Sequence, residues 1–162
     1  MLQKQTYPTS QTVNNSDIDR AVQYVYDKWD DLTRFYPEDS DTLIGLPRPY
    51  VIPSPKNSTG FAFEEMYYWD SYFTAQGLIV SGREELAEGM LEDLLYMAEK
   101  LGAIPNGNRY YLTGRSHPPF LTSYILDIYK IKQDNKWLKE VSKIAEDEYD
   151  EVWMSDLHPN WR

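Results

Sequence analysis

The chain of 162 residues is long enough for one domain with a hydrophobic core, and nothing in its composition marks a boundary between two domains. Its 16 basic and 26 acidic residues give a formal net charge of −10, which opposes binding to nucleic acid and to anionic membrane surfaces. It has no cysteine and only two histidines, His117 and His158, so we expect no disulfide, no thiolate metal site and no histidine-rich metal centre.

Residues 1–16 are polar and show no periodicity, and we interpret them as a loose lead-in to a single domain over residues 17–162. They contain no apolar segment typical of a secretion signal, and no run of about 18 apolar residues follows them. We therefore expect a cytoplasmic protein that does not cross a membrane.

A first helix is predicted over residues 16–36, where apolar side chains recur at intervals of three and four and form one stripe. The stripe consists of Ile18, Val22, Val25, Trp29, Leu32 and Phe35 or Tyr36. We expect it to face a hydrophobic core. Residues 37–60 contain five prolines and are predicted to be a long extended segment, a kind of loop that is often functional.

Two pairs of helices are predicted after this segment, and each pair joins an apolar helix to an amphipathic one. The first apolar helix covers residues 66–80 and should be buried on most sides, whereas the next helix, which stops at Gly102, has a solvated face. The second pair combines the apolar stretch 119–131 with an amphipathic helix that Asp134 or Asn135 caps. The two pairs repeat at a period of about 50 residues.

Helical hairpins of this kind are typical of two-layer rings with buried inner helices and solvated outer ones. Only "PYVIP" and "RYYL" suggest short extended pieces, so the sequence predicts an all-α fold. Two or three hairpins cannot close a ring. We therefore expect the chain to be part of a longer polypeptide.

Three stretches stand out as candidates for a binding site: "FAFEEMYYWDSYF", "IPNGNRYYL" and "GRSHPPF". Each lies at or just before the beginning of an apolar helix, so all three should meet at one end of the bundle. Trp69 and Asp70 form the most distinctive pair. A carboxylate that accepts two neighbouring hydroxyl groups beside an indole ring is a common way to bind a sugar.

These residues also have ordinary structural interpretations. Asp70 could cap a helix, Asn106 and Asn108 could form a turn, and Arg115 could be solvated. The aromatic residues, 15% of the chain, could build a tyrosine-rich core instead of a sugar site. No catalytic residues are assigned, because no carboxylate is spaced to form a triad with Ser116 and His117.

The three stretches resemble the trehalase family of inverting glycosidases. That family's pattern reads P-x-P-[FY]-V-V-P-G-G-R-F-R-E-x-Y-Y-W-D-[ST]-Y-[FW], followed by G-x-I-P-N-G-x-R and S-R-S-Q-P-P. The similarity is good over residues 46–119 and fainter over 16–153, where "EYDEVWM" resembles the family's "EYEFWM".

The resemblance implies an (α/α)6 toroid with six inner and six outer helices, of which this chain would be the N-terminal part. It implies a small sugar, a disaccharide, as substrate and no cofactor or metal. By position, it implies that Phe63, Trp69 and Asp70 bind the glucosyl unit and that Asn106 and Arg115 add polar contacts. His117 takes the place of a glutamine in the same set.

The sequence departs from the family at two hydrogen-bonding positions, where Ala62 replaces an arginine and His117 replaces the glutamine. These departures leave trehalose open as the substrate and admit another α-glucoside or a mannoside. The family's catalytic aspartate, in E-[ST]-G-W-D, its catalytic glutamate and its motif Q-W-D-Y-P-x-G-W have no counterpart before Arg162. Inversion needs a carboxylic acid and a carboxylate about 6.5–9.5 Å apart.

We therefore expect this chain to hold part of a sugar pocket without the catalytic acid and base, and to be inactive alone. A non-catalytic helical module that binds sugar is the alternative from another functional class. A helical interaction protein with no ligand is the third possibility.

Overall fold

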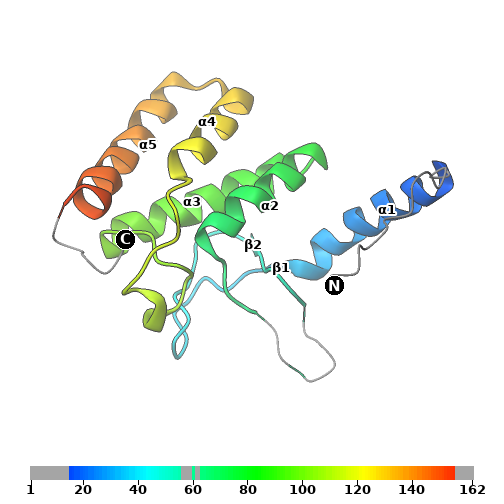
Figure 1. Cartoon of the computed structure of the whole chain (residues 1–162), viewed down its shortest axis with the longest axis horizontal. Helices are drawn as coiled ribbons and strands as arrows, with labels where there is room; N and C mark the ends of the chain where they lie inside the picture. Colours follow the sequence, from blue (N-terminus) through cyan, green and yellow to red (C-terminus); the bar gives the residue numbers. More distant parts are fainter. Residues whose placement is uncertain (1–14, 56–59, 61–62, 156–162) are drawn as a thin grey trace, which may run out of the picture.

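A computed structural model describes residues 15–55, 60 and 63–155 of the chain (Figure 1). Its elements follow one another as α1 (Asn15–Leu32), β1 (Thr33–Arg34), β2 (Tyr50–Val51), α2 (Tyr68–Val80), α3 (Glu84–Leu101), the 3₁₀ turn η1 (Tyr110–Leu112), α4 (Leu121–Lys132), α5 (Asn135–Glu148) and the π-helical turn η2 (Tyr149–Trp153). The predicted lead-in lies outside the described residues, except for Asn15 and Ser16, which open α1. Among the described residues, no helix is both long and apolar enough to cross a membrane.

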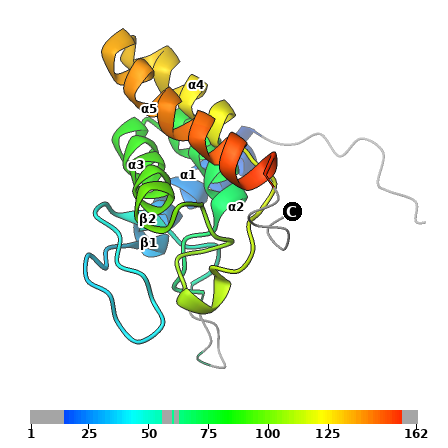
Figure 2. The same ribbon diagram turned by 90° about the vertical axis from the view of Figure 1, so that its left-hand side faces the viewer.

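The helices after β2 form two hairpins, α2 with α3 and α4 with α5, as the sequence predicts. Figure 2 shows the α4–α5 hairpin lying across the α2–α3 hairpin. The predicted ends hold: α3 stops at Gly102, whose φ of 75° is left-handed and favours glycine. Asp134 caps α5, since its carboxylate accepts the backbone N–H groups of Lys136 and Trp137. These local signals determine where α3 ends and where α5 begins.

The distribution of burial between α2 and α3 differs from the prediction. The helix α3, expected to have a solvated face opposite its apolar stripe, packs against α2, α4, α5 and β2 and buries nine of its residues. The helix α2, expected to be buried on most sides, buries only four and exposes Trp69, Phe73 and Val80. The apolar surface of α2 is therefore in part a free face. Its neighbours α3 and α4, and the ring of Trp29 against Gly77, leave the side chains of Trp69, Phe73 and Val80 exposed.

The apolar stripe of the first helix does not face a core over most of its length, so this prediction is wrong. No residue of α1 is buried, and Ile18, Val22 and Val25 are each almost half exposed. Figure 1 shows why, because α1 projects away from the two hairpins. Only its C-terminal end packs, through Trp29 and Leu32 against the core.

The segment after α1 is more folded than an extended loop. The strands β1 and β2 pair antiparallel, which confirms the extended piece near "PYVIP". Between them, Leu43, Ile44 and Leu46 are buried. Of the extended piece expected near "RYYL", only Arg109 is extended, and it forms an isolated antiparallel bridge with Leu43. The rest of the prediction is wrong, because Tyr110–Leu112 form a 3₁₀ turn in which the N–H of Leu112 donates to the carbonyl of Arg109.

Candidate functional site

Backbone hydrogen bonds bring the three candidate stretches together at the beginning of α2. Tyr67 forms an antiparallel bridge with Gly107, and the N–H of Tyr68 donates to the carbonyl of Asn106 at 3.1 Å. The N–H of Asn106 in turn donates to the carbonyl of Arg115 at 2.9 Å. This backbone ladder confirms the prediction that the stretches meet at one end of the bundle.

Asn108 fastens the ladder from within. Its side chain is fully buried, and its amide oxygen accepts the N–H of Met66 at 2.8 Å while its amide nitrogen donates to the carbonyl of Ile44 at 2.8 Å. A Cβ added at Gly107 would lie 3.0 Å from the carbonyl oxygen of Met66, so a side chain there would crowd the backbone. The interpretation of Asn108 as a turn residue holds for its backbone, since the N–H of Arg109 donates to the carbonyl of Gly107 at 2.7 Å around it. Its side chain is in addition a buried tie between three segments.

Five rings lie in a row along the surface of this end. The ring centroids are 6.1 Å apart for Phe63 and Tyr67, 6.3 Å for Tyr67 and His117, 5.3 Å for His117 and Trp69, and 6.4 Å for Trp69 and Phe73. Phe63, Trp69 and Phe73 are exposed. The planes of the end pairs are steeply inclined, by 76° for Phe63 and Tyr67 and by 71° for Trp69 and Phe73, so the exposed face of a single ring such as Trp69 is the apolar surface that suits the C–H face of a sugar.

Asp70 lies beside this row in the first turn of α2. The residue that caps the helix is Tyr67, so the interpretation of Asp70 as the cap is wrong. Its side chain is 47% exposed, and its Oδ2 lies 3.9 Å from Nδ1 of His117. The helix N-terminus favours a negative charge at this place. Asp70 thus presents carboxylate oxygens beside an exposed indole ring.

His117 is more buried than its neighbours. Its Nδ1 atom is inaccessible and has no hydrogen-bond partner among the described residues. Burial lowers the pKa of His117 below its ordinary value, the Asp70 carboxylate opposes this shift, and the charge of Arg115 adds to it. The imidazole is therefore mainly neutral at pH 7 and carries one donor and one acceptor nitrogen.

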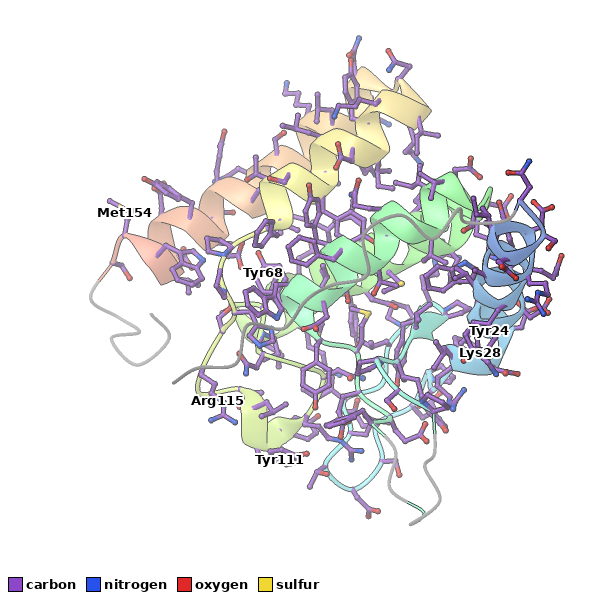
Figure 3. All side chains as sticks on the ribbon, turned by 45° about the vertical axis from the view of Figure 1, so that its right-hand side comes forward. Tyr24, Lys28, Tyr68, Tyr111, Arg115 and Met154 are labelled. Carbon is purple, nitrogen blue, oxygen red and sulfur yellow. The ribbon has the colours of Figure 1, made fainter. Side chains whose placement is uncertain are left out.

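The other two predicted residues also belong to this end of the bundle. Asn106 is half-buried and contributes both of its backbone groups to the ladder. Arg115 is exposed, and Figure 3 shows it on the loop beside η1, below Tyr68. The structure thus gathers all six predicted residues in one region. The departure at Ala62 lies outside the described residues.

Sequence reasoning missed a buried network behind the site. The hydroxyl of Tyr68 donates to Oε2 of Glu148 at 3.3 Å and accepts the N–H of Leu121 at 3.0 Å, which ties α5 to the beginnings of α2 and α4. Burial raises the pKa of Glu148 to about 7. Glu148 belongs to the "EYDEVWM" stretch, but 80 residues separate it from Tyr68, so no local pattern links the two.

Comparisons with known proteins agree with this description. The family model described as Trehalase matches residues 2–160. The chain is 39% identical over 140 residues to a probable trehalase of Oryza sativa subsp. japonica, and the match covers 83% of the chain and 24% of that protein. It is 37% identical over 142 residues to a periplasmic trehalase of Pseudomonas aeruginosa, covering 85% of the chain and 25% of that protein.

Among solved structures, neutral trehalase Nth1 from Saccharomyces cerevisiae matches with a TM-score of 0.61 and 28% identity, over 83% of the chain and 26% of that structure. The chain thus spans about a quarter of the length of these proteins. The all-α hairpins described above form part of the helical toroid that the sequence predicts. The matched length and the site motifs together show that the chain belongs to the trehalase family.

Proposed function

We propose that this chain is the sugar-binding part of a trehalase-like glycoside hydrolase, which hydrolyses α,α-trehalose or a related α-glycoside with inversion at the anomeric carbon. The observation that carries the proposal is the exposed Trp69 ring next to the half-exposed carboxylate of Asp70, within a chain of this family. The named trehalases among its relatives support the choice of substrate.

The chemistry of the site suits a glucosyl unit. The C–H face of the sugar stacks on Trp69 and Phe63, while two neighbouring hydroxyl groups donate to the oxygens of Asp70. Hydrogen bonds to a charged acceptor contribute about 1.5–3 kcal/mol each, so Asp70 is the main polar anchor. Asn106 and Arg115 near the row and His117 within it supply the further polar contacts.

Hydrolysis with inversion needs a catalytic acid and a catalytic base, and in the proposed mechanism residues 1–162 supply neither. The two glutamates next to the site are already engaged, because Glu64 accepts from Nε of Arg34 at 2.9 Å and Glu65 accepts from Nε of Arg109 at 2.6 Å. Glu65 is also buried. We propose that the acid and base lie outside residues 1–162, and that these residues alone do not hydrolyse a glycoside.

The test is an assay of α,α-trehalose hydrolysis by the complete product of the gene, run beside residues 1–162. We expect hydrolysis by the complete product alone, and a loss of at least about 100-fold in kcat/KM for Asp70→Asn, which removes the charged acceptor. Other α-glucosides and an α-mannoside serve as competing substrates. Faster hydrolysis of one of these would replace trehalose as the substrate within the same proposal.

A non-catalytic sugar-binding module is the second candidate, and the engagement of Glu64 and Glu65 by Arg34 and Arg109 beside the rings and the carboxylate of the site favours it. Saturable sugar binding without hydrolysis by the complete product would select this candidate. If the complete product neither binds nor hydrolyses a sugar, both candidate functions are contradicted. The cytoplasmic location stays a prediction, which fractionation of cells that express the tagged protein tests.

A further inference from the structure

His117 is the described residue at which the site departs from the family pattern, and it lies directly against the proposed sugar anchor. Its ring is tilted by 37° over Trp69, and its Nδ1 is 3.9 Å from Oδ2 of Asp70. That separation is longer than a hydrogen bond, which requires about 3.2 Å or less. Nδ1 is also inaccessible and has no hydrogen-bond partner among the described residues. The two groups are close to contact but do not bond.

The charged and titratable groups that face His117 come from three places. Asp70 faces it from α2, Tyr67 from the residue before α2, and Arg115 from its own loop. Burial raises the pKa of Tyr67 to about 12, so this phenol stays neutral near pH 7. Two charges therefore act on the imidazole of His117. The carboxylate of Asp70 favours its protonation, and the guanidinium of Arg115 disfavours it.

We propose that His117 is a positioning residue that controls Asp70 through its own protonation. The neutral imidazole leaves both oxygens of Asp70 free to accept sugar hydroxyls. The imidazolium closes the gap to Oδ2, forms an ion pair, and competes with the sugar for that oxygen. This inference rests on the proposed function, because it assigns a regulator to the same site.

The sign of the effect follows from linkage between proton and sugar. Since the sugar prefers the neutral form of His117, a proton on the imidazole weakens sugar binding. Affinity should be constant at alkaline pH and should fall as the pH falls through the pKa of His117, which burial places below the ordinary value for histidine. A glutamine at this position would offer a donor that does not titrate, so the departure from the family pattern introduces the pH dependence.

The experiment measures binding of D-glucose, which has no glycosidic bond to hydrolyse, to the complete gene product between pH 5 and pH 8. Tryptophan fluorescence follows the titration, and only the midpoint is compared, because protonation of a histidine beside an indole can change the intensity itself. We expect affinity about fivefold weaker at pH 5 than at pH 8. His117→Gln is the matched variant, and its affinity should not change over this range.

Asp70→Asn separates the inference from the proposed function. If this variant still binds glucose as the wild type does, Asp70 is not the anchor, and both the site assignment and its regulation by His117 are overturned. If this variant does not bind glucose, the assignment of Asp70 as the anchor holds. The pH dependence of affinity then tests the role of His117 separately. A wild-type affinity that is flat with pH, or one that falls equally in His117→Gln, overturns the inference. Equal thermal unfolding of both variants at pH 5 and pH 8 shows that the comparison is made between folded proteins.

Discussion

The helices α1 and α3 are both 18 residues long and both carry an apolar stripe, yet α3 buries nine residues and α1 buries none. The difference lies in their neighbours. The helix α3 has α2, α4, α5 and β2 around it, whereas α1 meets the core only through Trp29 and Leu32 at one end. Amphipathic periodicity predicts which face of a helix is apolar, but it does not say what covers that face.

The largest difference in stability is expected when one apolar residue in each of these two helices is replaced by alanine. Leu94 of α3 is fully buried, so Leu94→Ala should lower the free energy of unfolding by about 3 kcal/mol through lost contacts and a cavity. Val22 of α1 is 47% exposed, so Val22→Ala should cost less than about 0.5 kcal/mol. Urea unfolding of both variants measures the two values. Similar losses would mean that the stripe of α1 is covered.

A second contrast separates the two asparagines of the site end. Asn108→Ala leaves the N–H of Met66 and the carbonyl of Ile44 without partners in a buried place, and should cost about 2 kcal/mol. Asn106→Ala keeps the backbone ladder and should weaken sugar binding while leaving the free energy of unfolding within about 0.5 kcal/mol. Urea unfolding and glucose titration of the two variants test this split. A greater loss of stability for Asn106→Ala would contradict it.

The buried acid of α3 should make stability depend on pH. Burial raises the pKa of Asp93 from 3.8 to about 8, so the folded protein holds a proton that the unfolded chain releases between these values. The free energy of unfolding should therefore fall as the pH rises from about 4 to about 8, by up to about 1.4 kcal/mol per pH unit. Unfolding measured at each pH should show a reduced slope in Asp93→Asn.

The matched control for this slope is Asp19→Asn on the exposed surface of α1. It should leave the slope as it is in the wild type. Glu148 contributes to the same fall below pH 7, because burial raises its pKa to about 7, so some slope should persist in Asp93→Asn. If the free energy of unfolding of Asp93→Asn falls with pH as steeply as that of the wild type, Glu148 alone accounts for the pH dependence.

A smaller loss of stability is expected at the bond between Trp29, near the C-terminal end of α1, and Ser81. Nε1 of Trp29 donates to Oγ of Ser81 at 3.1 Å, and Trp29→Phe removes this bond and part of the ring contact with Gly77 while it keeps a smaller aromatic ring. The cost should be about 1 kcal/mol. Amide hydrogen exchange should then become faster over α1 and stay unchanged over α3. Equal acceleration in both helices would show that α1 is part of the cooperative core.

Local signals in the sequence predicted most of the fold. The hairpin helices, the end of α3 at Gly102 and the cap at Asp134 follow from periodicity and capping, which act over a few residues. The exposure of α1 and the 3₁₀ turn at Tyr110–Leu112 could not be predicted in this way. They depend on which distant segments come into contact.

The candidate site shows the same division. Residue chemistry alone indicated Trp69 and Asp70, the resemblance added the other four residues, and the structure places all six together, but their roles in sugar binding stay predictions. The network between Tyr68 and Glu148 was missed, because no spacing in the sequence links residues 80 positions apart. The ring of Tyr67 was also not assigned to the site, although it lies in "FAFEEMYYWDSYF" two positions before Trp69. The tie made by Asn108 was missed because its partners, Met66 and Ile44, lie 42 and 64 residues away.

The backbone ladder from Tyr68 through Asn106 to Arg115 has a consequence for how such a site can change over evolutionary time. Its bonds use main-chain N–H and C=O groups, which every residue except proline can provide in full. The half-buried side chain of Asn106 and the exposed one of Arg115 can therefore be exchanged without moving the frame, whereas the buried Tyr68, which is bonded to Glu148, cannot. A pocket built on this ladder can acquire a new substrate preference by single substitutions, each of which is tested by selection while the fold stays the same.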